Sequence, residues 1–290
     1  MPLSTATSAN QANESTLVTR ILITGSAQGL GRAAATTLLD DGHQVVVHAR
    51  DTSRAAALTD LVDRGAAVVI GDLASAQQTR HLAEQVNQLG RMDAVIHNAG
   101  VYGDRDRNPG PEGHPRVLAV NTLAPYLLTG LIERPDRLIY LTSDMHVSGD
   151  DSLQDLDWTT RRWNGTQASC DSKLFVTALA LAVARRWPNV ISHAVDPGWV
   201  PTRMGGPSAS DALEQGHLTQ TWLAVSGSPD ATRSGQVWHH HRPAPIAAAA
   251  RDSRFQDRLL KQLAEVAGSI SKVSTAQDAR PSRGQPMEDK

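Results

Sequence analysis

Short apolar runs alternate along this chain with longer amphipathic stretches. Six runs, each nearly continuous in Val, Ile and Leu, lie at residues 20–24, 44–48, 67–71, 93–97, 137–142 and 190–195. A continuous run of this kind is typical of a parallel strand that is buried on both faces. The stretches between the runs have the length and the Ala and Leu content of helices. This order predicts an α/β fold in a single domain, with a doubly wound parallel sheet and helices on both faces.

A seventh short strand at 236–239 and a last helix at 252–267 complete the predicted domain, which gives the sheet about seven strands. We expect the folded domain to cover residues 17–268. Residues 1–16 lack the basic start and apolar core of a secretory signal. We expect a disordered leader at 1–16 and a disordered tail at 269–290, because these polar segments bury too little apolar surface to offset the entropy of ordering. No apolar run approaches the roughly 20 residues that span a bilayer.

Composition excludes several classes of function. Apolar residues make up 40% and charged residues 20% of the chain, which is enough apolar material for a sizeable core. With 28 basic and 30 acidic residues the net charge is -2, so no overall field attracts nucleic acid or an anionic membrane. A single cysteine, Cys170, excludes an internal disulfide framework. It fits the reducing cytoplasm, where we expect the protein to be located.

A glycine-rich turn follows the first predicted strand directly and opens the first predicted helix. Its spacing is Gly-x-x-x-Gly-x-Gly. Glycine allows a sharp turn and a close backbone approach to a pyrophosphate, which the N–H groups and dipole of a helix N-terminus then stabilise. The context of strand before and helix after predicts a dinucleotide site. We expect cofactor contacts from Gly25, Ser26, Gln28, Gly29, Leu30 and Gly31.

The residues after the second strand bear on the choice between NAD(H) and NADP(H). An acidic residue there would bind a free ribose 2′-hydroxyl, whereas Arg would pair with a 2′-phosphate. Here Ala49 precedes Arg50, so we expect NADP(H) rather than NAD(H), although Arg50 as an ordinary surface charge stays open and Asp51 follows it. Asp72 and Leu73, after the third strand, are expected at the adenine edge.

Further motifs follow in a fixed order along residues 17–268. They are Asn98-Ala99-Gly100 after the fourth strand, Asn121 in VNTLAPYLL, Ser143 after the fifth strand, Lys173 in SCDSK, and Asp196-Pro197-Gly198 with Thr202 after the sixth. Together with the glycine-rich turn, they resemble the short-chain dehydrogenase/reductase family. The resemblance implies a Rossmann-like fold, a small-molecule substrate and oxidoreductase activity with a nicotinamide cofactor. Paired subunits are usual in this family, so a homodimer is possible, with helix 172–187 as a candidate interface.

The resemblance also implies roles for individual residues. Asn98, Ala99 and Gly100 would line the adenine-ribose side of the cofactor groove. Ser143 would hold a substrate carbonyl oxygen, and Lys173 would bind the nicotinamide ribose hydroxyls. The nicotinamide amide would be bracketed by Pro197, Gly198, Val200 and Thr202.

Asn121 is also singled out by the proline that follows it. Pro125 lies four residues later and has no N–H, so the Asn121 carbonyl loses its helical partner. A freed carbonyl can bind a water. The family uses such a water to connect its lysine to solvent.

One family feature is absent from the sequence. The family carries Tyr-x-x-x-Lys, in which the phenol exchanges the proton while the hydride moves, but Ser169 stands four residues before Lys173. Only three tyrosines, Tyr102, Tyr126 and Tyr140, occur in the chain, and none follows residue 140. A serine hydroxyl is shorter and a far weaker acid, and a positioned general acid contributes about 10² to 10⁴-fold to a rate.

Several groups can replace the phenol. The sequence leaves open a water between Ser169 and Lys173, Lys173 itself, or another side chain in the cleft. Tyr102 is the best-placed phenol, two residues after Gly100, whereas Tyr126 and Tyr140 are expected in the core. Asp144 and His146 are further candidates. We therefore favour a carbonyl reductase with an altered proton donor over a redox-neutral enzyme or a binding protein without turnover.

The substrate side is predicted to mix apolar and polar groups. We expect substrate contacts from Tyr102, Asp144, Trp199 and Met204, which suit a small or polycyclic ketone. The segment after Thr202 begins with glycines and can act as a lid. The run His239-His240-His241 is not expected to bind a metal, because successive residues of a strand point to opposite faces.

Overall fold

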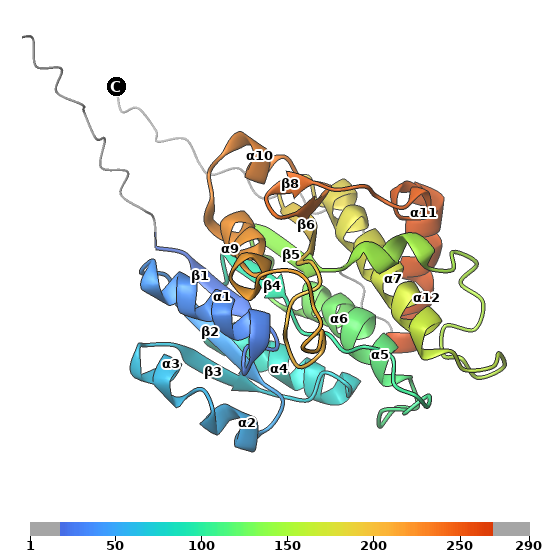
Figure 1. The fold of residues 1–290 in the computed structure, drawn as a ribbon, viewed down its shortest axis with the longest axis horizontal. Coiled ribbons are helices and arrows are strands. Elements are labelled where there is room, and N and C mark those ends of the chain that lie inside the picture. Colours follow the sequence, from blue (N-terminus) through green and yellow to red (C-terminus); the bar gives the residue numbers. More distant parts are fainter. Residues whose placement is uncertain (1–17, 269–290) are drawn as a thin grey trace, which may run out of the picture.

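The computed structural model describes residues 18–268, and Figure 1 shows a single central sheet with helices on both sides. The sheet has the strand order β3-β2-β1-β4-β5-β6-β7-β8. All neighbouring strands are parallel except β7 and β8. The strands are β1 Arg20–Ile23, β2 Gln44–Ala49, β3 Ala67–Ile70, β4 Ala94–His97, β5 Arg137–Leu141, β6 Ile191–Asp196, β7 Gln236–His239 and β8 Arg242–Pro243.

The predicted fold class is confirmed, since seven parallel strands lie where the apolar runs are. The short antiparallel β8 was not predicted, because its two residues carry no apolar pattern. The helices are α1 Gly29–Asp40, α2 Thr52–Ala56, α3 Thr59–Asp63, α4 Ala76–Gln88, α5 Arg116–Leu118, α6 Ala124–Leu131, α7 Gly165–Arg186, α8 Leu213–Gly216, α9 Leu218–Val225, α10 Pro229–Thr232, α11 Ala248–Arg251 and α12 Ser253–Ala267, with a π-helix η1 Ala119–Leu123 and a 3₁₀ helix η2 Asp144–Ser148.

Two apolar cores explain why the strands are continuous in Val, Ile and Leu. Leu22 and its paired neighbours Val46 and Val95 belong to one core, on the face covered by α4, α6, α7 and α12. Ile21 and Ile23, on either side of Leu22, belong to the other core, beneath α1 and α9. Because successive side chains of a strand point to opposite faces, Ile21, Leu22 and Ile23 are all buried, two in one core and one in the other.

Helix α7 does not offer the open face that a subunit interface needs. Its side chains from Leu174 to Val183 are all buried, and α11 and α12 of the same chain pack against it. The rings of Phe175 and Phe255 lie 6.5 Å apart in this contact. The expectation that helix 172–187 supplies an interface is therefore wrong, because the C-terminal helices already cover it. A homodimer through another surface stays a prediction.

Two further predictions concern the ends of the chain and the membrane. The expected disordered segments, 1–16 and 269–290, lie outside the described residues. Within residues 18–268, no helix has both the length and the apolar character that crossing a membrane requires.

Candidate active site

Most of the expected site residues follow the carboxyl ends of parallel strands, which meet at one edge of the sheet, whereas Asn121 lies in η1 and Lys173 in α7. The strand order reverses between β1 and β4, since β2 and β3 lie on one side of this pair and the later strands on the other. Open α/β sheets bind ligands in the crevice at such a reversal. The turns after β1 and β4 are therefore the centre of the candidate site.

The glycine-rich turn packs closely against the turn after β4. Gly25 and Gly29 have φ angles of +68° and +57°, which favour glycine. A Cβ at Gly25 would lie 2.9 Å from Ala99 Cα, and one at Gly31 would lie 2.4 Å from Asn98 Nδ2 and 2.6 Å from the Gly25 carbonyl oxygen. The Asn98 amide fastens this contact by donating to the carbonyl oxygen of Thr24 over 2.9 Å.

The N-terminus of α1 is suited to an anion. Gln28 precedes the helix without a capping hydrogen bond from its side chain, and the first turn has no acidic residue. A helix end of this kind presents N–H groups and a partial positive charge, which a phosphate can satisfy. Thr202 lies across the turn, because a Cβ at Gly29 would be 3.4 Å from its methyl carbon. The arrangement fits the pyrophosphate of a dinucleotide.

His48, on the neighbouring strand β2, supports this turn through a hydrogen bond, a role that the sequence reasoning missed. Its Nδ1 accepts the Gly25 N–H over 2.9 Å, so its Nε2–H donates to the Gly71 carbonyl over 2.8 Å. Burial lowers the pKa of His48 and favours the neutral ring that both bonds require. Ser26 is fully buried in the same network, with its hydroxyl donating to the Ile23 carbonyl. A histidine inside an apolar strand was the available signal.

Two arginines lie at the end expected to bind the 2′-phosphate. Arg50 is exposed and pairs with Asp51 over 3.2 Å. The Asp51 side chain caps α2 by accepting the Arg54 N–H. Arg54, which the sequence reasoning missed, then donates from its guanidinium to the Gln28 side chain over 3.2 Å. Asp51 three residues before Arg54 has the spacing of a helix cap, and this pattern could have indicated where Arg54 lies.

Asp72 and Leu73 differ in how far they reach the expected adenine edge. The Asp72 carboxylate accepts the Ala74 N–H over 2.9 Å and is half-buried. The Leu73 side chain is buried in the core beneath α4. Only Asp72 therefore presents a polar side chain at this edge.

Asn121 lies inside a local widening of its helix. Residues 119–123 form the π-helix η1, in which the Ala124 N–H reaches back to the Ala119 carbonyl, just before Pro125. The expected disturbance at this proline thus takes the form of a π-turn. The buried Asn121 amide accepts the Val101 N–H over 2.8 Å and donates to the Val101 carbonyl and the Ser172 hydroxyl.

Lys173 lies next to Gly100 and Asn121. A Cβ at Gly100 would be 3.8 Å from the Lys173 ammonium and 3.6 Å from the Asn121 amide oxygen. The ammonium donates to the Leu141 carbonyl over 3.0 Å. Burial lowers the pKa of Lys173 to about 8, against the opposing effect of the Asp196 carboxylate. The lysine can therefore release and regain a proton near neutral pH.

Ser143 begins η2 and is held by its neighbours. Its hydroxyl oxygen accepts the Met145 N–H over 3.3 Å, which leaves the hydroxyl proton for a substrate oxygen. His146 Nδ1–H donates to the Ser143 carbonyl over 2.6 Å, and its Nε2 accepts the Ala247 N–H. His146 therefore positions Ser143 from a buried place, whereas Asp144 is exposed.

Ser169 joins the start of α7 to the loop after β4. Its hydroxyl donates to the Gly165 carbonyl over 2.9 Å and accepts the Gly103 N–H over 2.7 Å. The two glycines touch, since a Cβ at Gly103 would lie 2.1 Å from the Gly165 carbonyl oxygen. The single Ser169 proton is thus directed at the backbone and not into the cleft.

The three tyrosines lie in different surroundings. Tyr126 and Tyr140 are fully buried, as expected, and burial raises the pKa of both phenols. Tyr102 is 46% exposed, and its hydroxyl donates to the Thr166 hydroxyl over 3.0 Å. Tyr102 is therefore the phenol that a ligand can reach.

Exposed apolar side chains surround the carboxyl edge of the sheet. Tyr102, Val147, Trp199 and Met204, in the segments that follow β4, β5 and β6, are each about half exposed. The Trp199 indole donates to the Gly205 carbonyl, which fixes it on the segment that precedes α8. This segment crosses in front of the sheet in Figure 1. The rim of the site is therefore apolar on these three loops.

The turn after β6 is held by carboxylates on two sides. Gly198 has a φ of +82°, and its N–H donates to the Asp196 side chain over 2.9 Å. The Trp199 N–H donates to the Asp211 side chain, and the Asp211 N–H returns to the Trp199 carbonyl. Val200 is buried beyond the turn. The turn thus keeps a fixed shape beside the site.

The three histidines do not lie on one strand, as the sequence reasoning assumed. Only His239 belongs to β7, and the chain turns at His240 and His241, whose φ angles are +46° and +61°. The rings of His239 and His240 therefore stack 4.0 Å apart instead of pointing to opposite faces. Among residues 18–268, no group of three or more His, Cys, Asp or Glu side chains is arranged to hold a metal.

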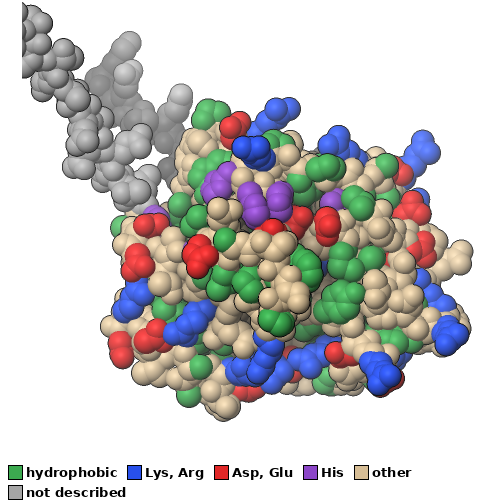
Figure 2. All heavy atoms as spheres, in the orientation of Figure 1, with side chains coloured by type: hydrophobic (Ala, Val, Ile, Leu, Met, Phe, Trp, Pro, Cys, Tyr) green, Lys and Arg blue, Asp and Glu red, His purple; other side chains and the backbone are tan. Residues whose placement is uncertain are grey.

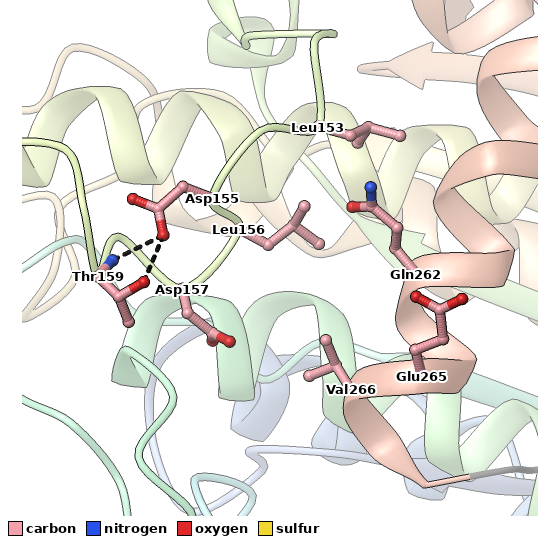
Figure 3. Close-up of a pocket in the computed structure, with 8 residues that line it drawn as sticks. All are labelled: Leu153, Asp155, Leu156, Asp157, Thr159, Gln262, Glu265 and Val266. Atoms are coloured by element: carbon pink, nitrogen blue, oxygen red, sulfur yellow. Dashed lines mark hydrogen bonds between the residues drawn. The ribbon is translucent and has the colours of Figure 1, made fainter.

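A shallow hollow elsewhere contains none of the expected residues. Figure 3 shows it between the loop at 153–159 and α12. The Asp155 carboxylate points into the loop itself and accepts from the backbone N–H and the hydroxyl of Thr159, each over 2.7 Å. The hollow is lined by Leu153, Asp155, Leu156, Asp157, Thr159, Gln262, Glu265 and Val266. It plays no part in the candidate site.

Comparison with known proteins gives consistent results. A family model described as short chain dehydrogenase matches residues 19–134. An uncharacterized oxidoreductase of Emericella nidulans is 40% identical over 254 residues, covering 86% of this chain and 97% of the relative. DnrU of Streptomyces sp. strain C5, a candidate daunorubicin C-13 ketoreductase, is 31% identical over 271 residues, covering 87% and 93%. The NADPH-bound carbonyl reductase from chicken fatty liver has a similar fold, with a TM-score of 0.62, 20% identity and coverage of 79% and 99%.

The close packing at Gly31 predicts the effect of a single added methyl group. We expect Gly31→Ala to weaken dinucleotide binding at least about tenfold, because the new Cβ meets the Gly25 carbonyl and the turn must shift. The matched control is Gly227→Ala, where nothing lies within 4 Å of the added Cβ. Titration of NADPH fluorescence measures both variants. Unchanged affinity in Gly31→Ala would contradict this assignment of the turn.

Proposed function

The chain belongs to the short-chain dehydrogenase family and is an oxidoreductase of that type, and from this we propose that it uses NADP(H) to reduce a carbonyl group of a small or polycyclic molecule. One observation carries the proposal. The uncapped N-terminus of α1 lies at the same sheet edge as Ser143 and Lys173, so a cofactor site and two reactive polar groups occur together. The description of the relative DnrU as a candidate ketoreductase supports carbonyl reduction as the class of reaction.

The two arginines support the preference for NADP(H). The guanidinium of Arg54 contacts Gln28 of the glycine-rich turn, and Arg50 is exposed at the end of β2. Guanidinium groups form strong, directed hydrogen bonds with phosphate oxygens. Ala49 stands at the end of β2, where an acidic residue would bind a free 2′-hydroxyl, and the Asp51 carboxylate that follows is engaged by Arg50 and by the Arg54 N–H.

The proposed site assigns a role to each polar group. When bound, the reduced nicotinamide supplies a hydride to the carbonyl carbon. Ser143 donates its hydroxyl proton as a hydrogen bond to the carbonyl oxygen and so stabilises the charge that develops there. Lys173 would hold the ribose hydroxyls, and Asn98, Ala99 and Gly100 would line the groove. The turn from Pro197 to Thr202 would lie against the nicotinamide end.

We assign the proton to Lys173. The Ser169 proton is already directed at the Gly165 carbonyl, and the phenols of Tyr126 and Tyr140 are buried in the core. The Lys173 ammonium, with its pKa lowered to about 8, matches the acidity that efficient general acids have near neutral pH. Lys173 would donate its proton to the carbonyl oxygen, and the neutral amine would regain a proton from solvent. The Asn121 carbonyl in the π-turn is the proposed place for a water on that route.

The rim suits an apolar substrate. Tyr102, Trp199 and Met204 are each about half exposed on loops around the site, where they can contact flat or apolar surface. Asp144 is exposed beside Ser143 and adds a polar contact. We therefore propose an aryl or polycyclic ketone as the class of substrate.

The arginine assignment predicts a change in cofactor preference. We expect Arg50→Ala and Arg54→Ala each to raise the KM for NADPH about tenfold, because each removes a charged hydrogen bond to the 2′-phosphate. The KM for NADH should not change. Arg64→Ala is the matched control, since Arg64 is similarly exposed but pairs with Asp40 at the far end of α1. Equal losses with NADPH and NADH would contradict the assignment.

The lysine assignment predicts how ketone reduction depends on pH. Below a pH of about 8 Lys173 carries the proton, and above it the donor is lost. We expect kcat to fall about tenfold for each further pH unit. Ser169→Ala adds no bulk beside Gly103 and removes only a hydroxyl whose proton is directed at the Gly165 carbonyl. This variant should therefore retain the pH profile. A profile that is flat through this range in the wild type, or abolished by Ser169→Ala, would contradict the role of Lys173.

A further inference from the structure

The histidines after β7 form a tight turn whose position has no explanation in the proposed reaction so far. Trp238 pairs with Pro243 and His239 with Arg242, so the hairpin loop consists of His240 and His241 alone. Both loop residues have positive φ angles, as a type I′ turn requires. Asn-Gly is the favoured pair in such a turn. Two histidines in left-handed conformation are unusual, and backbone of this kind gathers at functional sites.

His239 contacts the backbone of the last residue of β6, and His240 contacts that of the first residue of the turn after β6. His239 Nδ1–H donates to the Asp196 carbonyl over 3.2 Å, and the same nitrogen lies 3.6 Å from the Asp196 carboxylate. His240 Nε2–H donates to the Pro197 carbonyl over 3.3 Å. The ring of His240 also closes the space at Gly198, where a Cβ would lie 3.1 Å from Nε2.

His241 anchors the hairpin to the helix on its other side. Its N–H donates to the Thr219 hydroxyl over 3.0 Å, and its ring lies 5.1 Å from that of Trp222. Thr219 and Trp222 belong to α9. Figure 2 shows histidine side chains gathered in one cluster, in the region where Figure 1 labels β8. The hairpin is therefore fixed on α9 and holds the turn after β6 through two imidazoles.

We propose that His239 and His240 are positioning residues for the nicotinamide end of the cofactor. They hold the carbonyl oxygens of Asp196 and Pro197, and thereby fix the turn that the proposed function places against the nicotinamide. This inference rests on that function. Neither imidazole takes part in hydride or proton transfer. Their effect is to keep the Pro197–Gly198 turn in one position, so that the cofactor finds it already in place.

The two contacts use different ring nitrogens, and this allows a crossed test. The side-chain nitrogen of Asn takes the place of histidine Nδ1, whereas that of Gln takes the place of Nε2. His239→Asn and His240→Gln should therefore keep the hydrogen bonds, whereas His239→Gln and His240→Asn should lose them. Asn also suits the positive φ at 240, so a loss in His240→Asn would not come from damage to the hairpin.

Binding measurements distinguish contacts at the nicotinamide end of the cofactor from contacts at its adenosine end, and they require no turnover. The affinities for NADPH and for adenosine 2′,5′-bisphosphate, which has no nicotinamide, are measured for the full chain and all four variants. We expect His239→Gln and His240→Asn to bind NADPH about five- to tenfold more weakly, as the loss of one hydrogen bond implies. Adenosine 2′,5′-bisphosphate should bind all five proteins equally, and His239→Asn and His240→Gln should bind NADPH like the wild type.

Other results would overturn the inference. If all four variants bind NADPH like the wild type, or if both ligands weaken together, the histidines do not position the nicotinamide end. If Asn and Gln act alike at each position, the hydrogen bonds are not the cause. A wild-type protein that binds neither ligand would instead overturn the proposed cofactor, which is a separate result.

Discussion

The close contact between two backbone turns, one after β1 and one after β4, sets the geometry of the whole site. At Gly25 and Gly31 a side chain would penetrate Ala99, Asn98 or the turn itself, so only glycine allows the contact. The contact fixes where α1 begins and leaves its N-terminus open. His48 and Asn98 then hold the turn from the two neighbouring strands, through the Gly25 N–H and the Thr24 carbonyl. An anion site built this way is rigid before any ligand arrives.

A second contact between backbones accounts for the reactive end. Gly103 and Gly165 touch, and Ser169 joins them with a hydroxyl that both donates and accepts. The Ser169 hydroxyl oxygen lies 2.7 Å from the Gly103 nitrogen. The residue four positions before Lys173 is therefore part of the wall of the site, and the lysine is the buried group whose pKa lies close to neutral. This is the physical basis for assigning the proton to Lys173.

The sequence was informative where local pattern decides the structure. Strands buried on both faces leave continuous apolar runs, and a proline without an N–H disturbs its helix, so the seven parallel strands and the irregularity at Asn121 were predictable. Contacts between segments far apart in the sequence could not be predicted from local pattern. His48 and Arg54 act through the glycine-rich turn more than twenty residues away, and α7 is covered by a helix about eighty residues later. The histidine run was misread because a turn between β7 and β8 depends on backbone angles that its residue types do not favour.

Transfer of deuterium from the cofactor to a ketone would show whether the protein is a carbonyl reductase. The protein is incubated with NADPH deuterated at C4 of the nicotinamide and with a series of aryl and polycyclic ketones, and products are analysed by mass spectrometry and NMR. We expect an alcohol with deuterium on the carbinol carbon, formed in equal amount to the NADP⁺ released. NADPH that binds but is not oxidised with any ketone, or a product formed without net oxidation of NADPH, would contradict it.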